Sequence, residues 1–139
     1  MNAFSKSISN QNTVSIVLLI TRLAVALLML NHGYPKLTKL LAGGEIQFAD
    51  PLGVGVTFSL ILAVFAEFLC SILIGLGLFT RLATIPLMIT MFVAAFIVHG
   101  ADPIARKELA ILYLVLYIML FVFEGGKFSL DYFVRGKKA

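Results

Sequence analysis

The sequence predicts an all-α membrane protein, a polytopic four-helix bundle that forms one integral membrane domain over residues 1–139. Two observations lead to this prediction. The chain is 60% hydrophobic and only 13% charged, whereas soluble domains carry about 25% charged residues. Its apolar residues also gather in four long runs without strand-like alternation, and helices satisfy every backbone hydrogen-bonding group in lipid.

The four runs cover residues 13–31, 57–80, 83–99 and 109–124. The first follows a polar tail over 1–12 that has no small-residue cleavage site, so we expect a retained span. The second would extend about 36 Å as a helix, enough to cross a hydrocarbon core of ~30 Å. The last two, with 17 and 16 residues, are short for spans. Charged residues at their ends can reach the interface and allow both to cross.

Two further segments border these runs. Between the first and second runs, Pro35 can begin a helix and Gly43 can end it. Leucines and lysines at helical spacing predict a short interfacial helix near 35–42. The basic tail over 125–139 carries aromatic side chains among its lysines and arginines, which predicts an interfacial anchor.

Basic residues in the short loops favour a cytoplasmic position for both termini. Six lie on the side of the termini: Lys6, Arg81, Lys127, Arg135, Lys137 and Lys138. Four lie on the other side, among acidic residues: Lys36, Lys39, Arg106 and Lys107. We therefore predict a multi-pass protein of the cell inner (plasma) membrane. The net charge of +4 suits contact with a lipid bilayer, and no basic stripe with aromatic residues indicates nucleic acid.

Glu67, near the middle of the second run, is the first candidate site residue. A charged carboxylate at that depth costs roughly 2.5 kcal/mol or more, so it requires a partner. We predict Arg22 as that partner, because the two residues differ in depth by about 6 Å on the helical rise. Such a pair could bind a ligand head group or a proton. It could equally be an internal ion pair that fixes the helix register.

Two helix faces extend this buried polar centre. Cys70 and Ser71 share the face of Glu67. Tyr113 and Tyr117 share one face of the fourth run. Both faces can line a ligand pocket or serve as packing seams. Cys70 is the single cysteine, which excludes an intrachain disulfide, and a thiol in apolar surroundings is usually inert.

A second cluster is expected at the opposite, periplasmic face. Its members are ionisable residues near the ends of the runs: His32, Lys36, His99, Asp102 and Glu108. Their spacing differs from metal-binding patterns such as H-E-x-x-H, so we predict no metal site. Plain hydrogen bonding at helix ends would explain the cluster. The same donors could also hold the carbonyl oxygens of a quinone, and a histidine can transfer protons near neutral pH.

Three segments resemble the DoxX family of small bacterial and archaeal membrane proteins. They are RLAVALLMLNHGYPKL (22–37), AEFLCSILIGLGLFTRLA (66–83) and KELAILYLVLY (107–117), the last followed by EGGKFSLD. The resemblance covers about residues 22–131 and departs at Glu124-Gly-Gly, where the family often has Gly-Pro-Gly. It marks these positions without giving them roles: Arg22, His32, Gly33, Lys36, Glu67, Gly75 and Glu108.

The resemblance implies a four-helix inner-membrane protein, and some members are named as parts of thiosulfate:quinone oxidoreductases or other membrane redox assemblies. We therefore predict a quinone- or lipid-interacting subunit that works with a redox partner protein. The chain has no flavin motif or paired cysteines, so we do not expect a self-sufficient enzyme, and we assign no catalytic residue. The alternative is a non-catalytic assembly or carrier factor that binds a lipid or small solute. A transporter is weaker, because four helices form a narrow bundle unless they assemble as a homo-oligomer.

Overall fold

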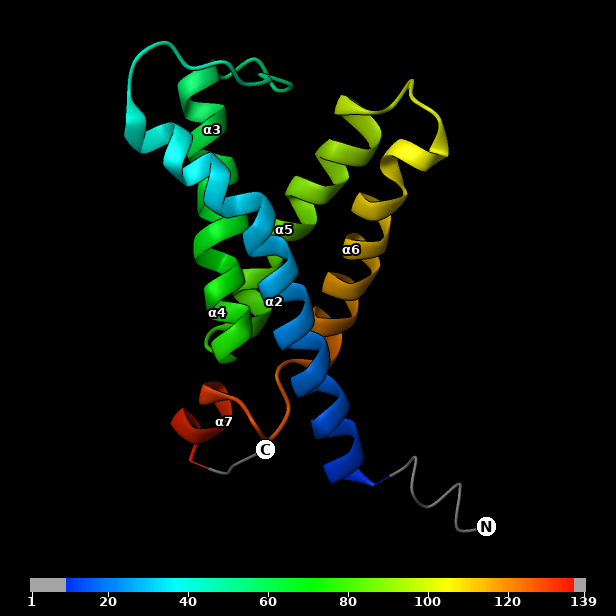
Figure 1. Ribbon diagram of the computed structural model, residues 1–139. Helices are drawn as coiled ribbons and strands as arrows, with labels where there is room; N and C mark the ends of the chain where they lie inside the picture. Colours follow the sequence, from blue (N-terminus) through cyan, green and yellow to red (C-terminus); the bar gives the residue numbers. More distant parts are fainter. Residues whose placement is uncertain (1–9, 137–139) are drawn as a thin grey trace.

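The structure, a computed structural model, describes residues 10–136, and all its regular elements are helices (Figure 1). The first is α2 (Gln11–Ala42), which the Asn10 side chain caps. The second long helix, Val56–Leu76, consists of three consecutive segments: α3 (Val56–Val64), the π-helical segment η1 (Phe65–Cys70) and α4 (Ser71–Leu76). The third comprises α5 (Thr80–Val93) and the π-helical segment η2 (Ala94–Val98). Then come α6 (Ile104–Phe123) and the short α7 (Leu130–Val134).

Three of these helices are long and apolar enough to cross a membrane: Gln11–Ala42, Val56–Leu76 and Thr80–Val98. The fourth long helix, α6, has 20 residues and carries Arg106, Lys107 and Glu108 in its first turns. The predicted all-α class with four long helices is confirmed. Most of the predicted polar tail over 1–12, with Lys6, lies outside the described residues, as do Lys137 and Lys138.

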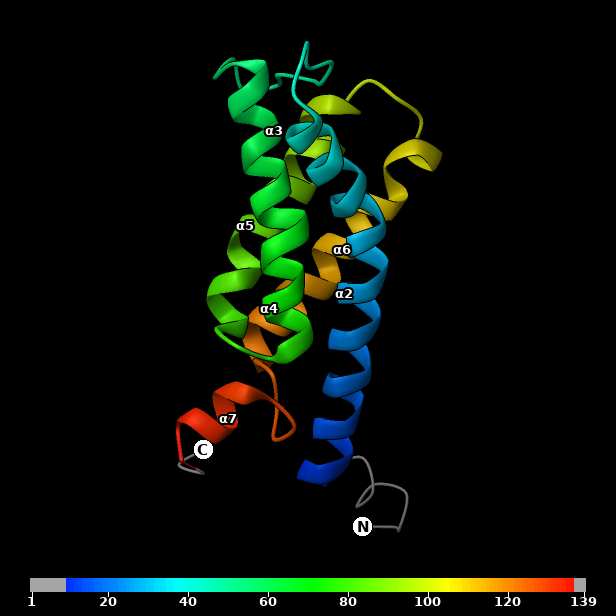
Figure 2. The ribbon, with the colours of Figure 1, turned by 60° about the vertical axis from the view of Figure 1, so that its left-hand side comes forward.

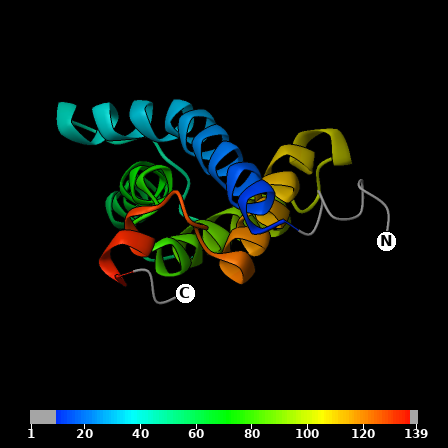
Figure 3. The same ribbon diagram turned by 90° about the horizontal axis from the view of Figure 1, so that it is seen from below.

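The four long helices pack unevenly along their length. α5 and α6 form an antiparallel pair, and α2 packs against α3, η1 and α4 on one side and α6 on the other. Seen from below, α2 lies tilted across the Val56–Leu76 helix, which is viewed nearly end-on (Figure 3). We call the end that holds α7 the terminal end. The end that holds the segments 43–55 and 99–103 is the loop end (Figure 1).

The predicted separate interfacial helix near 35–42 is wrong, because α2 continues through Pro35 to Ala42. A proline inside a helix removes a hydrogen bond and usually breaks or kinks the helix. Here tertiary contacts stabilise the helical path. A Cβ on Gly33 would lie 2.5 Å from the Glu67 carbonyl oxygen, so the α2 backbone lies directly against η1. One turn later, Lys36 pairs with the Glu67 side chain.

The interior is apolar and draws on each long helix, with Met29, Ile74, Leu87 and Leu120 almost fully buried. Large apolar side chains are also exposed all along the outside of the bundle, among them Leu27, Leu82 and Phe123. Contiguous exposed apolar surface of this kind marks an interaction surface, and on long apolar helices it fits contact with lipid.

We expect Gly33→Ala to lower the free energy of unfolding by about 1–3 kcal/mol, the usual range for overpacking. The new methyl group would meet backbone atoms of Glu67 and Phe68, which cannot rotate away. Gly75→Ala is the matched control, because its methyl group would meet only the Ala26 side chain, at 3.2 Å. Unfolding in detergent micelles measures both. Equal stability of the two variants would contradict the close packing of α2 on η1.

Candidate functional site

The candidate site is built around an ion pair between Lys36 on α2 and Glu67 on η1. The Lys36 ammonium donates a hydrogen bond to the Glu67 carboxylate. The Glu67 side chain is 3% exposed and that of Lys36 is 30% exposed. A carboxylate removed from water is stable only with a partner of opposite charge. Lys36 supplies that partner from the part of α2 that the sequence did not assign to a span.

The predicted pairing of Glu67 with Arg22 is wrong. Gly33 lies at the level of Glu67. Arg22 precedes Gly33 by eleven residues, which places it about 16 Å away along α2. The prediction treated residues 13 and 80 as helix ends at equal depth. The helix with Glu67 ends at Leu76, however, and α2 runs tilted past it toward the terminal end (Figure 3).

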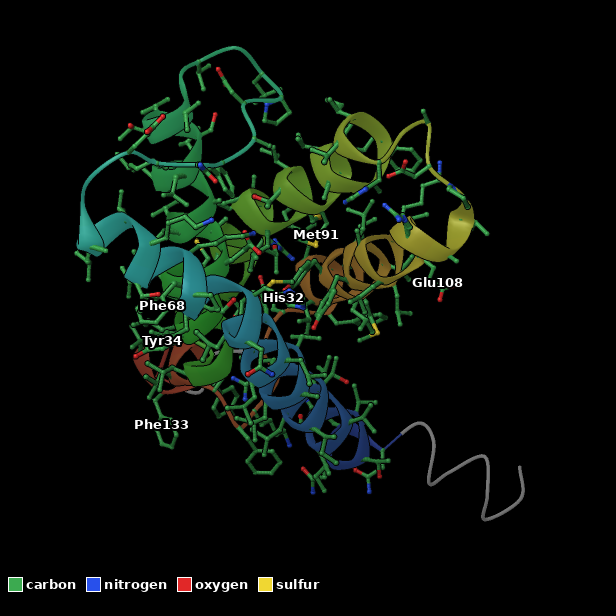
Figure 4. All side chains as sticks on the ribbon, turned by 45° about the horizontal axis from the view of Figure 1, so that its top comes forward. His32, Tyr34, Phe68, Met91, Glu108 and Phe133 are labelled. Atoms are coloured by element: carbon green, nitrogen blue, oxygen red, sulfur yellow. The ribbon has the colours of Figure 1, made fainter. Side chains whose placement is uncertain are left out.

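A polar cavity of about 250 Å³ lies between α2, α5, η2 and α6. Its polar lining residues are His32, Lys36, Glu67, Thr90, His99, Arg106 and Tyr113. The His32 and Tyr113 rings pack edge to face with their centroids 6.3 Å apart. His32 and Met91 lie toward the middle of the bundle in Figure 4, whereas Glu108 lies far out on α6. The cavity therefore offers several hydrogen-bond donors around one buried carboxylate.

A second, largely apolar cavity of about 290 Å³ adjoins the same ion pair. Its apolar lining comes from the segment 43–55, α3, α5 and η2: Phe48, Ala49, Pro51, Leu52, Leu62, Ala63, Ile89, Val93 and Val98. The two cavities share five lining residues: Lys36, Glu67, Thr90, Ala94 and His99. The Lys36–Glu67 pair thus belongs to the common wall of a polar and an apolar space.

Both π-helical segments found in residues 10–136 border this site. η1 carries Glu67, and η2 ends directly before His99. A π turn inserts an extra residue into the helical repeat, and such turns occur frequently at functional sites. In this protein they fall on two helices that face one another across the cavities.

His99 and Asp102 connect the site with the loop end. His99 Nδ1 lies 2.8 Å from Asp102 Oδ2, and both side chains are partly exposed. A carboxylate beside one ring nitrogen fixes the orientation of a histidine and the roles of its two nitrogens. Because His99 also lines both cavities, its ring can transfer protons between the cavities and the surface of the loop end.

A second layer of polar side chains lies one turn further toward the terminal end. Cys70, Ser71 and Tyr117 are all buried there, and Tyr117 stacks on Tyr113 with centroids 5.9 Å apart. Neither the Ser71 nor the Tyr117 hydroxyl has a hydrogen-bond partner within the described part of the chain. Of the predicted polar centre, Glu67 and Tyr113 therefore line a cavity. Cys70, Ser71 and Tyr117 are buried directly behind it.

Arg22, predicted for the same centre, belongs to a separate cluster at the terminal end. Its fully buried guanidinium donates a hydrogen bond of 2.6 Å to the Phe128 carbonyl, and Asp131 provides the opposing charge. The Asp131 carboxylate also accepts hydrogen bonds from the backbone N–H groups of Phe79 and Thr80, at 2.7 and 2.9 Å. Arg22 thus fixes the C-terminal segment beneath the bundle.

The structure brings together most of the predicted loop-end cluster. His32, Lys36 and His99 line the polar cavity, and Asp102 bonds to His99. Glu108 is an exception, because it is exposed on the first turns of α6 and lines neither cavity.

Sequence reasoning missed most of the other lining residues, among them Thr90, Arg106 and Phe48. Phe48 lies in a loop without periodicity, and Arg106 resembles an ordinary charged helix end. The sequence does contain one indication that Lys36 belongs to the site. Lys36 follows Gly33 by about one helical turn, so it lies on the helix face that can pack closely against a neighbour.

Comparison with known proteins gives the chain a family context. The model of the family described as DoxX matches residues 17–100, which include His32, Lys36, Glu67 and His99. A Haemophilus influenzae protein described as uncharacterized is 37% identical over 121 residues, covering 79% of this chain and 84% of that protein. No solved structure matches the chain.

We expect Lys36→Met to destabilise the protein by about 3 kcal/mol, the lower end of the loss for a broken buried pair, because Lys36 is partly exposed. The variant leaves the Glu67 carboxylate without its partner. The double variant with Glu67→Gln should recover most of the lost stability, because no buried charge then remains unpaired. Unfolding in detergent micelles measures this cycle. A double variant as unstable as Lys36→Met alone would show that the pair does not govern stability.

At the terminal end, Asp131→Ala should cost about 1–3 kcal/mol, because two N–H groups at the start of α5 lose their acceptor and Arg22 loses its opposing charge. Amide hydrogen exchange at Phe79 and Thr80 should accelerate. Asp102→Ala at the loop end is the control and should leave these two amides unchanged. Unchanged exchange in Asp131→Ala would contradict the capping role.

Proposed function

The chain belongs to the DoxX family of membrane proteins, and we propose that it is a quinone-binding subunit of a membrane redox assembly. The observation that carries the proposal is the Lys36–Glu67 pair in the common wall of a polar and an apolar cavity. Ionisable residues inside membrane spans are functional candidates by default. Small-molecule sites combine an apolar lining with a few placed polar groups, as these two cavities do.

The donor set fits the two carbonyl oxygens of a quinone. Lysine has three N–H donors, of which the Lys36–Glu67 pair uses one. His32 and the Tyr113 hydroxyl provide further donors in the same cavity. A bound quinone would supply two-electron chemistry coupled to two protons. Glu67 would keep Lys36 in place beside the ring, and His99 with Asp102 would exchange protons with the surface of the loop end.

A partner protein would supply the electrons. The sequence has one cysteine, which is buried, and no nucleotide-binding glycine motif, so this chain would contribute the ligand site and the proton route. The distribution of basic residues supports an inner-membrane protein with cytoplasmic termini. In that orientation the His99–Asp102 pair would face the periplasm.

Binding of a tail-less dimethoxy-methyl-benzoquinone to the protein in lipid nanodiscs tests the proposal. We expect saturable binding, and a loss of about two- to tenfold in Tyr113→Phe, because one hydrogen bond contributes roughly 0.5–1.5 kcal/mol. Tyr132→Phe is the matched control, since Tyr132 lies at the terminal end. Lys36→Met compared with Lys39→Met gives a second matched pair on α2.

Two results would refute the proposal. One is an absence of saturable binding to the wild-type protein. The other is equal loss of affinity in Tyr113→Phe and Tyr132→Phe, which would place the ligand elsewhere. A tightly bound phospholipid that the quinone does not displace would instead favour the alternative of a non-catalytic lipid carrier or assembly factor.

A further inference from the structure

We infer that the apolar cavity holds the hydrocarbon tail of the same ligand, which enters sideways from the lipid between α3 and α5. This inference rests on the proposed function for the identity of the head group. It assigns the ligand to one chemical class, an amphiphile with a polar ring and a long apolar tail that resides in the membrane.

The position of the cavity indicates a lateral opening. α5 packs against η1 and α4. Toward the loop end, α3 and the far end of α5 diverge (Figure 1). The apolar cavity lies in this divergence, with Leu62 and Ala63 on the α3 side and Ile89 and Val93 on the α5 side.

The rim of the cavity faces lipid. Leu62 is 41% exposed and Ile89 is 57% exposed, and both belong to helices that could cross a membrane. Val98, at the end of η2, is similarly exposed. Exposed apolar side chains within a span contact hydrocarbon. A molecule that enters between these residues therefore comes from the bilayer, not from water.

The loop end of the same cavity is covered by the segment 43–55. Phe48 and Leu52 line the cavity there, and the Phe48 ring lies 5.8 Å from Lys36 Nζ. Asp50 holds the segment by accepting hydrogen bonds from the Gly55 N–H and the Ser59 hydroxyl. The Ser59 hydrogen bond lowers the pKa of Asp50, so this anchor stays charged at neutral pH. The segment thus restricts water while the lipid side stays open.

One end of the apolar cavity is polar, because Lys36, Glu67 and His99 line it and also line the polar cavity. The shared residues place the two spaces side by side, so a ring in one and a tail in the other would extend past these side chains. A tail gains little hydrophobic free energy on leaving lipid, which is itself apolar. The cavity would therefore orient the ligand more than it would raise affinity, and a test must report where the tail lies.

The protein contains no tryptophan, so Leu62→Trp introduces a single reporter at the rim. Leu23→Trp on α2 is the matched control, since Leu23 is 44% exposed and lines neither cavity. The probe is a decyl-benzoquinone with bromine at the end of its tail, titrated into nanodiscs. The same quinone without bromine corrects for quenching by the ring.

We expect bromine-dependent quenching of Leu62→Trp to saturate and to be reversed by excess tail-less benzoquinone. Quenching of Leu23→Trp should rise linearly with probe dissolved in the lipid. Ile89→Trp, on the opposite rim, repeats the test in case the tryptophan at residue 62 obstructs entry. Linear quenching at both rim positions would overturn the inference. If the tail-less quinone still binds the wild-type protein, the proposed function survives that result, and if it does not bind, both fail.

Discussion

The structure depends on the contact between α2 and η1, where a carboxylate inside an apolar helix receives its counter-charge from a neighbouring helix. For Lys36 to reach Glu67, α2 must approach the η1 backbone closely, which Gly33 permits because it has no side chain. The same contact explains why α2 stays helical through Pro35. It also places two charged groups in the wall between the two cavities, so one interaction links the packing of the helices to the chemistry of the site.

The two ends of the molecule are held by different contacts. At the terminal end, Arg22 bonds to the Phe128 carbonyl, Asp131 caps α5, and Glu124 pairs with both Arg81 and Arg135, so α7 is held beneath α4 (Figure 2). At the loop end the helices diverge and leave the cavities. The hydrogen bonds and ion pairs at the terminal end fix the relative positions of the helices, although a cavity of about 210 Å³ also lies there between α2 and the C-terminal segment. At the loop end, a ligand can occupy the two cavities without further contacts between the helices.

The sequence was sufficient to predict helices and buried polar residues but not their partners. Hydrophobic runs identified the four long helices, and the cost of a charge in lipid identified Glu67 and Arg22 as residues that need partners. The partners depend on helix tilt and on a helix that crosses a proline, and neither follows from local sequence. Lys36 was therefore assigned to the interface instead of the interior. Asp131 was not considered, because only the folding-back of the C-terminal segment brings it near Arg22.

The chemistry of Lys36 explains how a site can use a charge that the fold also requires. An arginine at this position would present its planar fork to the carboxylate and commit two donors to Glu67. A lysine ammonium is compact and has three donors that rotate about one bond. It can keep one hydrogen bond to Glu67, which stabilises the contact between α2 and η1, and direct another toward an oxygen in the polar cavity. A ligand can then bind at the common wall without leaving the buried carboxylate unpaired.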